Sequence, residues 1–293
     1  MDFSTAAKRI DAYERLIRLD KPAGALLLLW PTLWAVWIAS QGRPGLDIVL
    51  IFVAGTFLMR SAGCALNDWA DRDFDGRVAR TRDRPLAAGE IAPKEALILA
   101  AALAAAAFVL VLFLNRFTIL LSVAALAVAC AYPFAKRFVP LPQLGLSIAF
   151  SFGIPMAFAA IRKELPWECW ALFAANACYV FAYDTEYAMA DREDDLKIGI
   201  RSSAITLGRH DVAAVMGSYV AMIGILAWIG IALRLAWPYH LGLTVASGVM
   251  LYQHALIRDR FRDDCFRAFR YNVWIGLAVF AGIVLSYFLP EFM

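Results

Sequence analysis

Long apolar runs alternate with short polar segments along the whole chain. A bilayer-spanning helix needs about 20 mainly apolar residues, and nine runs of roughly that length are present. They lie at residues 22–40, 47–66, 95–114, 117–134, 142–160, 167–187, 212–233, 237–257 and 271–289. The pattern predicts an all-α integral membrane protein in which residues 1–293 form one polytopic domain of nine transmembrane helices.

The polar segments predict an orientation because their basic residues are unevenly distributed. Alternate segments, beginning with residues 1–21 and 67–94, hold 22 of the 28 Lys and Arg residues, whereas the intervening segments and the C-terminal tail hold 5. Lys and Arg are enriched in the cytoplasmic loops of membrane proteins. We therefore expect the N-terminus in the cytoplasm, the C-terminus on the periplasmic side, and the acidic segments at the cytoplasmic face.

Composition agrees with a membrane protein. Hydrophobic residues make up 62% of the chain and charged residues 18%, against about 45–50% and 25% in ordinary soluble domains. The net charge of +3 is explained by basic cytoplasmic loops, so no nucleic-acid partner is expected. The five cysteines show no CxxC pairing, which argues against a disulfide framework or a zinc site.

The segment NDWADRDFDGRVARTRDRP, residues 67–85, directly follows the second apolar run. Asn67, Asp71 and Asp75 are spaced by four residues, and Asp68 lies three residues before Asp71. Residues three, four and seven apart share a helix face. The spacing therefore predicts a stripe of oxygen-bearing side chains at the cytoplasmic end of a membrane helix.

Two other interpretations of this segment fail on its spacing. An EF-hand loop that starts at Asp71 needs a bidentate Glu at its twelfth position, where Arg82 stands. The signature of CDP-alcohol phosphotransferases opens in a similar way and continues with a glycine, which Gly89 matches. The two aspartates that should follow are replaced by Pro93 and Leu97.

A second acidic segment, YDTEYAMADREDDLKIGIRSS, follows the sixth apolar run at residues 183–203. Asp184, Asp191 and Asp195 are spaced by seven and four residues, so they also share a helix face. The neighbouring carboxylates point elsewhere on this pattern and are expected to be solvated: Asp73, Glu193 and Asp194.

Facing carboxylates repel each other unless cations lie between them. Mg²⁺ prefers oxygen ligands and is commonly held by one or two carboxylates together with phosphate oxygens of a substrate. A diphosphate bound in this way becomes a better leaving group. We therefore interpret the two segments as halves of a magnesium–diphosphate site, with basic neighbours such as Arg72, Arg84 and Lys197 as phosphate contacts.

Arg60 is a charged residue inside the second apolar run, seven residues before Asn67 and on the same helix face. An intramembrane charge costs at least about 2.5–3.5 kcal/mol on insertion scales and indicates a functional site. Such charges also mark the ion pathways of cation-coupled transporters, which remain an alternative function. A transport pathway must reach both faces, however, whereas the acidic residues gather at one.

The sequence resembles the UbiA-type intramembrane aromatic prenyltransferases over essentially its whole length. The resemblance is carried by RLDKPAGALLLLWPTLWA, RSAGCALNDWADRDFDGRVARTRDRPL, YPFAKRF and AYDTEYAMADREDDLKIGIRSSAI; the last is similar to the branch that acts on 4-hydroxybenzoate. It implies nine helices around a central cavity in the bacterial inner membrane. It also implies Mg²⁺-dependent transfer of a polyprenyl group, from a polyprenyl diphosphate in the lipid phase to an aromatic ring carbon, in ubiquinone biosynthesis. Another aromatic or quinone acceptor is the alternative.

The resemblance also assigns roles to residues of this chain. Asn67, Asp71, Asp75, Asp191 and Asp195 are expected to hold Mg²⁺ and the diphosphate. Asp68 and Asp184 are further members of the site, and Tyr132 and Lys136 are expected near the diphosphate. The acceptor carries a carboxylate, for which Arg60 is the first candidate and Arg137 an alternative, with Asp184 nearby. Asp191 is the expected base, and Asp71 and Asp75 share the catalytic role.

Overall fold

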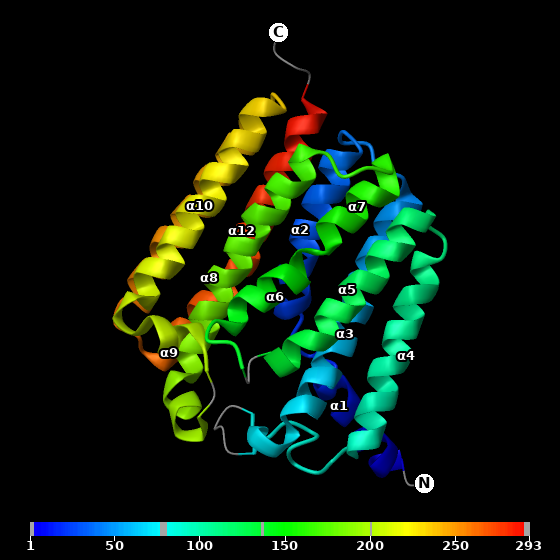
Figure 1. Cartoon of the computed structure of the whole chain (residues 1–293), viewed down its shortest axis with the longest axis vertical. Helices are drawn as coiled ribbons and strands as arrows, with labels where there is room; N and C mark the ends of the chain where they lie inside the picture. Colours follow the sequence, from blue (N-terminus) through cyan, green and yellow to red (C-terminus); the bar gives the residue numbers. More distant parts are fainter. Residues whose placement is uncertain (1–2, 77–80, 136–137, 200, 290–293) are drawn as a thin grey trace.

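The computed structural model describes residues 3–76, 81–135, 138–199 and 201–289, and the regular structure within these ranges is helical. The long helices run side by side between two ends of the molecule (Figure 1). Their bounds are α1 Phe3–Leu16, α2 Ala23–Ala39, α3 Leu46–Asp75, α4 Pro93–Val111, α5 Arg116–Ala135, α6 Pro142–Ser151, α7 Gly153–Arg162, α8 Trp167–Ile198, α9 Ser203–Leu207, α10 Asp211–Ala232, α11 Trp237–Ile257 and α12 Arg262–Phe288.

The predicted apolar runs coincide with these helices, except that the fifth run is divided between α6 and α7. Five of the described helical stretches are long and apolar enough to cross a membrane, and α2 and part of α5 are shorter apolar helices. The all-helical fold is therefore confirmed. The count of nine spans and the orientation stay predictions.

The break between α6 and α7 has a local cause. Pro155 has no backbone N–H, so the carbonyl of Ser151 loses the donor that a continuous helix provides four residues later. Asn176 of α8 lies at this break, where its amide donates to the Ser151 hydroxyl at 2.9 Å and to the Phe150 carbonyl at 3.4 Å. Polar compensation from a neighbouring helix is how broken helices are tolerated inside membranes.

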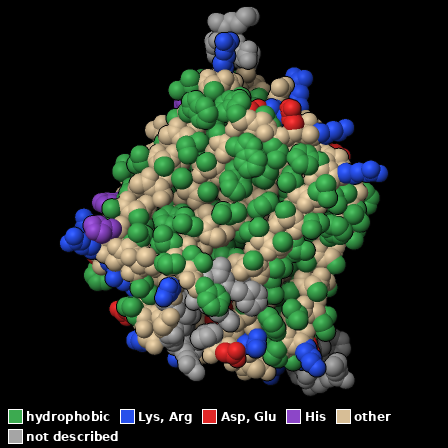
Figure 2. Space-filling model, viewed as in Figure 1, with side chains coloured by type: hydrophobic (Ala, Val, Ile, Leu, Met, Phe, Trp, Pro, Cys, Tyr) green, Lys and Arg blue, Asp and Glu red, His purple; other side chains and the backbone are tan. Residues whose placement is uncertain are grey.

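The face shown in Figure 2 is covered by apolar side chains across its middle, with charged side chains gathered toward the two ends. Large hydrophobic residues are exposed along α4, α5, α10 and α11, including Ile98, Leu120, Val220 and Leu251. Contiguous apolar surface of this kind marks contact with lipid or with another protein. On a bundle with membrane-length helices, it fits a lipid-facing belt.

A buried polar network ties α8 to α10 and α12. Glu186 is fully buried; its carboxyl group lies 3.0 Å from the Tyr219 hydroxyl and accepts from the Asn272 amide at 2.8 Å. The same Tyr219 hydroxyl lies 2.8 Å from the Asn272 side-chain oxygen. Because a hydroxyl has a single proton, it satisfies both oxygens only when Glu186 carries a proton of its own. The network therefore fits a neutral Glu186.

Both acidic motifs lie on helices longer than the bilayer. At about 1.5 Å rise per residue, the 30 residues of α3 and the 32 residues of α8 span about 45 and 48 Å, whereas the hydrocarbon layer is about 30 Å thick. The helix α8 stops at Gly199, whose φ of +74° is a conformation that favours glycine. The last turns of both helices thus extend past the hydrocarbon at one end.

The short helix α1 precedes α2, the first of the apolar helices. Its Ala12 and Leu16 side chains are buried in one cluster with Ala65 of α3 and with Ala96 and Ala100 of α4. Ion pairs join Arg9 to Glu95 and Arg15 to Glu90. The N-terminal segment is therefore packed on the same end of the bundle that carries the acidic motifs.

Candidate active site

The predicted stripe on α3 is formed as expected. Asp68, Asp71 and Asp75 are buried, Asn67 is half-buried and Asp73 is exposed. The helix ends at Asp75, whose carbonyl accepts a 2.8 Å hydrogen bond from the hydroxyl of Thr81 in the following loop. Burial raises the pKa of Asp75, and the nearby positive charge of Arg84 partly opposes this effect.

Two arginines hold the carboxylates of this motif. Arg84 donates through a single nitrogen, Nη1, to Asp68 and to Asp75, at 2.9 Å in each case. Arg18, from the connection between α1 and α2, donates to both oxygens of Asp68 at 3.0 and 2.8 Å. One cationic nitrogen thus lies between two carboxylates, which is the arrangement that facing acids require.

The second motif follows the prediction except at one position. Asp191 is buried, Asp184 and Asp195 are half-buried, and Glu193 is exposed. Asp194 was expected to be solvated, and this is wrong: its side chain is 8% exposed and accepts a 3.0 Å hydrogen bond from Arg262 of α12. The hydrogen bond from Arg262 lowers the pKa of Asp194.

A cavity of about 1070 Å³ begins between the two motifs and continues among apolar side chains of α2, α3, α4, α5 and α7. Its polar part is lined by Arg18, Arg60, Asn67, Asp68, Arg84, Tyr132, Tyr183, Asp184 and Tyr187. The cavity therefore has a charged region at the end with the acidic motifs and an apolar region that reaches deep into the bundle.

The two motifs converge on this charged region. Tyr132 of α5 lies close enough to Asp71 of α3 and to Asp184 of α8 to interact electrostatically with both. In the same way, Arg84 interacts with Tyr187 of α8. Side chains from the two predicted halves therefore surround one end of one cavity.

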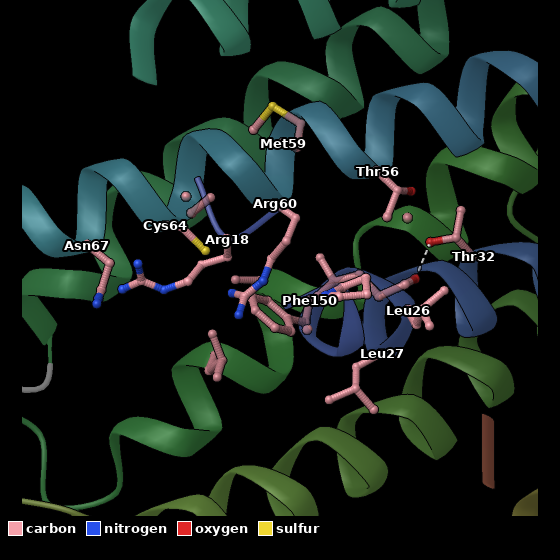
Figure 3. Close-up of a pocket in the computed structure, with 18 of the residues that line it drawn as sticks. Arg18, Leu26, Leu27, Thr32, Thr56, Met59, Arg60, Cys64, Asn67 and Phe150 are labelled. Atoms are coloured by element: carbon pink, nitrogen blue, oxygen red, sulfur yellow. Dashed lines mark hydrogen bonds between the residues drawn. The ribbon is translucent and has the colours of Figure 1, made fainter. Parts of the chain in front are cut away.

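Arg60 lies on the cavity wall, as the sequence suggested (Figure 3). Its guanidinium stacks over the Phe150 ring, with the Cζ atom 5.7 Å from the ring centroid. A Cβ atom on Gly24 would stand 2.6 Å from an Arg60 nitrogen, so the glycine provides the room. Among the residues that the structure describes, no acceptor reaches Arg60 Nε.

Other predicted site residues are more dispersed. Arg72 is exposed, stacks over Trp69 at 5.0 Å and donates to the Trp69 carbonyl. Lys197 is also exposed, 3.5 Å from Asp194. Lys136 and Arg137 lie outside the described residues. Asp71, Asp75, Asp191 and Asp195 are absent from the cavity wall itself.

The oxygen-bearing side chains of the two motifs fit a magnesium ion that is bound partly by the protein and partly by a substrate. Within the described ranges, no three His, Cys, Asp or Glu side chains are grouped closely enough to hold a metal by themselves. The side chains that the two motifs supply are hard oxygen donors, the ligand type that Mg²⁺ prefers. Mg²⁺ ordinarily completes such a set with water and phosphate oxygens.

Arg18 is the residue that sequence reasoning missed. It lies in RLDKP, just before the first apolar run, and its partner Asp68 is 50 residues away. An arginine in a basic N-terminal segment is indistinguishable by pattern from the others that define the orientation.

Comparison with known proteins identifies the family of this fold. Residues 28–284 match the UbiA prenyltransferase family. This chain belongs to that family. A protein of Cupriavidus necator named 4-hydroxybenzoate octaprenyltransferase is 58% identical over 280 residues, covering 96% of this chain and 98% of the relative. A protein of Methylobacillus flagellatus with the same name is 57% identical over 95% of this chain and 94% of its own length.

Solved structures support the fold. An apo UbiA homologue from Aeropyrum pernix K1 superimposes with a TM-score of 0.78 at 27% identity, covering 89% of this chain and 97% of the homologue. A UbiA homologue from Archaeoglobus fulgidus, described as bound to GPP and Mg²⁺, has a TM-score of 0.67 at 17% identity and covers 92% and 99%. At that identity the second likeness supports the fold alone.

Proposed function

We propose that this protein transfers a polyprenyl group from a polyprenyl diphosphate to 4-hydroxybenzoate, at the ring carbon next to the hydroxyl, and releases diphosphate in ubiquinone biosynthesis. The observation that carries the proposal is the cavity, which joins a charged region at the two acidic motifs to a long apolar region. The names of the relatives at 56–58% identity support the same acceptor and favour an eight-unit chain.

The donor fits the cavity in one direction only. Its diphosphate belongs at the charged end, where Arg84 is already directed at the first motif. Its prenyl chain belongs among the apolar side chains of α2, α4, α5 and α7, where removal of the chain from water is favourable by about 25 cal/mol per Å². This placement puts the C–O bond that breaks at the junction of the two regions.

Magnesium would be held by the donors that the two motifs supply: Asn67, Asp71, Asp75, Asp191 and Asp195. When bound, it neutralises the charge that develops on the departing diphosphate. Arg84 and Tyr132 lie at the same end of the cavity and contribute hydrogen bonds to that group.

Arg60 orients the acceptor. It is a cation on the cavity wall, and its Nε has no acceptor among the described residues. A planar guanidinium suits a carboxylate because it offers two parallel N–H donors. With its carboxylate on Arg60, the acceptor directs its hydroxyl-bearing edge along the cavity toward the prenyl carbon.

The ring then attacks the allylic carbon as the diphosphate leaves, and a base removes the ring proton. Tyr183 and Tyr187 present aromatic rings to this part of the cavity, and such rings attract a developing cation. Asp191 is the base expected from the sequence, whereas Asp184 is the carboxylate of α8 that lines the cavity. Exclusion of water by the surrounding apolar wall protects the cation.

The exposed apolar belt supports a membrane location, and the excess of Lys and Arg at the end with the acidic motifs supports a site that faces the cytoplasm. The inner membrane of a bacterium supplies both the lipid-borne donor and the aqueous acceptor at that face. A transport function is not favoured, because the charged cavity residues gather at one end.

The proposal is tested with membranes that contain the protein, octaprenyl diphosphate, and a panel of acceptors with magnesium or with EDTA. We expect a prenylated product from 4-hydroxybenzoate only when magnesium is present. Product from another aromatic acceptor, and none from 4-hydroxybenzoate, would overturn the acceptor assignment and leave the reaction class intact.

A further inference from the structure

Arg18, Asp68 and Arg84 form a cluster, called here the arginine clamp, in which one carboxylate serves two guanidinium groups. The Asp68 side chain is 2% exposed; its Oδ2 accepts from Arg18 at 2.8 Å, and its Oδ1 accepts from Arg18 at 3.0 Å and from Arg84 at 2.9 Å. Both oxygens of Asp68 are therefore engaged by cations, and the clamp carries a net charge of +1.

The backbone at Arg18 shows that its placement has a cost. Arg18 has a φ of +60°, a left-handed conformation that costs a non-glycine residue about 1–2 kcal/mol. Its other terminal guanidinium nitrogen donates to the Arg15 carbonyl at the end of α1. Non-glycine residues held in this conformation concentrate at functional sites, and here the benefit is a guanidinium fixed on Asp68.

The clamp faces the cavity. Arg18, Asp68 and Arg84 all line its charged end, and Figure 3 shows the Arg18 side chain extending toward Asn67 of the first motif. Arg84 also donates to Asp75, at 2.9 Å. If Asp75 turns to a metal ion, Arg84 keeps Asp68 as its anchor, and the positive charge of the clamp becomes available to an anion in the cavity.

We propose that Asp68 is a positioning residue rather than a magnesium ligand, and that it directs Arg18 and Arg84 at the diphosphate of the donor. Arg18 thereby becomes a diphosphate contact supplied by the N-terminal segment. This inference rests on the proposed function, because it needs a diphosphate donor in the cavity. A metal ion at Asp68 would have to share an oxygen that already accepts an arginine N–H, and would lie beside a positive charge.

The test compares Asp68→Asn with Asp71→Asn, two changes of equal size on the same helix face. An amide at position 68 has a single acceptor oxygen and cannot hold both arginines, so we expect the KM for octaprenyl diphosphate to rise about 10- to 100-fold, the value of one or two charged hydrogen bonds. The magnesium concentration for half-maximal rate should stay within about threefold of wild type, because the proposal has no magnesium bound to Asp68. Asp71→Asn should instead raise the magnesium concentration for half-maximal rate and leave the KM for octaprenyl diphosphate close to that of wild type.

A second readout needs no turnover. Magnesium alone raises the Tm of a protein that binds it in the folded state. We expect wild type and Asp68→Asn to show the same rise, and Asp71→Asn to show a smaller one. Arg18→Gln should reproduce the high donor KM of Asp68→Asn, and the double variant should be no worse than either single one, because the two residues act as a unit.

The inference is overturned if Asp68→Asn loses the magnesium response, or if its donor KM equals that of wild type. Should Asp68→Asn fail to fold, Arg18→Gln decides alone, and a normal donor KM in that variant contradicts the clamp. The two proposals fail separately. A wild-type protein that makes no prenylated 4-hydroxybenzoate refutes the function, whereas the magnesium-alone comparison still reports on Asp68.

Discussion

Replacing Arg60 with methionine should weaken acceptor binding without weakening the fold. Burying the charge costs at least about 2.5–3.5 kcal/mol on insertion scales. Among described residues, the Arg60 guanidinium stacks on the Phe150 ring at 5.7 Å, which is worth about 0.5–2 kcal/mol, and the Asp184 carboxylate also attracts it. Arg60→Met should therefore stabilise the fold by at most about 3 kcal/mol, whereas loss of the carboxylate contact should lower kcat/KM for 4-hydroxybenzoate about 10- to 150-fold.

Arg162→Met is the matched control. Arg162 donates to the carbonyl oxygens of Ala39 and Ile38 at 2.9 and 3.2 Å and pairs with Glu168, whose side chain is 7% exposed. Removing it leaves a buried carboxylate uncompensated, which costs about 3–5 kcal/mol. Thermal unfolding in detergent and steady-state kinetics should therefore separate the two variants. If Arg60→Met unfolds as early as Arg162→Met and keeps its acceptor kinetics, Arg60 is structural.

Three further outcomes follow from local contacts. A methyl group on Gly153 would overlap the Thr32 hydroxyl, so Gly153→Ala should cost about 1–3 kcal/mol in thermal unfolding, and adding Thr32→Ala should recover most of it. The lowered pKa of Asp194 beside Arg262 contributes stability above the usual aspartate range that is lost as pH falls through the lowered value; Asp194→Asn should flatten this acid dependence of Tm, and an unchanged profile would contradict it. Glu186→Gln should keep the buried network and cost less than about 1 kcal/mol, whereas Glu186→Ala should cost about 2–4; equal losses would contradict a neutral Glu186.

Much of the fold was predictable because membrane helices are encoded locally. Apolar runs of sufficient length predicted where the helices lie, although α3 and α8 end at Asp75 and Ile198, well beyond their runs, and α12 begins well before its run, at Arg262. The spacing of Asp71 and Asp75 predicted a stripe that the continuous helix α3 produces. The break before α7 also has a local signal, since Gly153 and Pro155 lie close together. Such features depend on neighbours along the chain.

The contacts that sequence reasoning missed depend on neighbours in space. Asp194 was expected in solvent because its position falls off the metal-facing stripe, but α12 packs there and brings Arg262 to it. Arg18 was missed because its partner belongs to another helix. Charge spacing along one helix predicts which side chains share a face, but it does not predict which helix packs against the opposite face.

The central claim is a single magnesium–diphosphate site built from two distant motifs. The most direct measurement is the formation of prenylated 4-hydroxybenzoate by wild type, Asp71→Ala and Asp191→Ala, each confirmed as folded, across a magnesium titration. The account predicts that wild type alone gives magnesium-dependent product and that either substitution abolishes it. Wild-type rates in Asp191→Ala, with loss only in Asp71→Ala, would contradict a site shared by the two motifs.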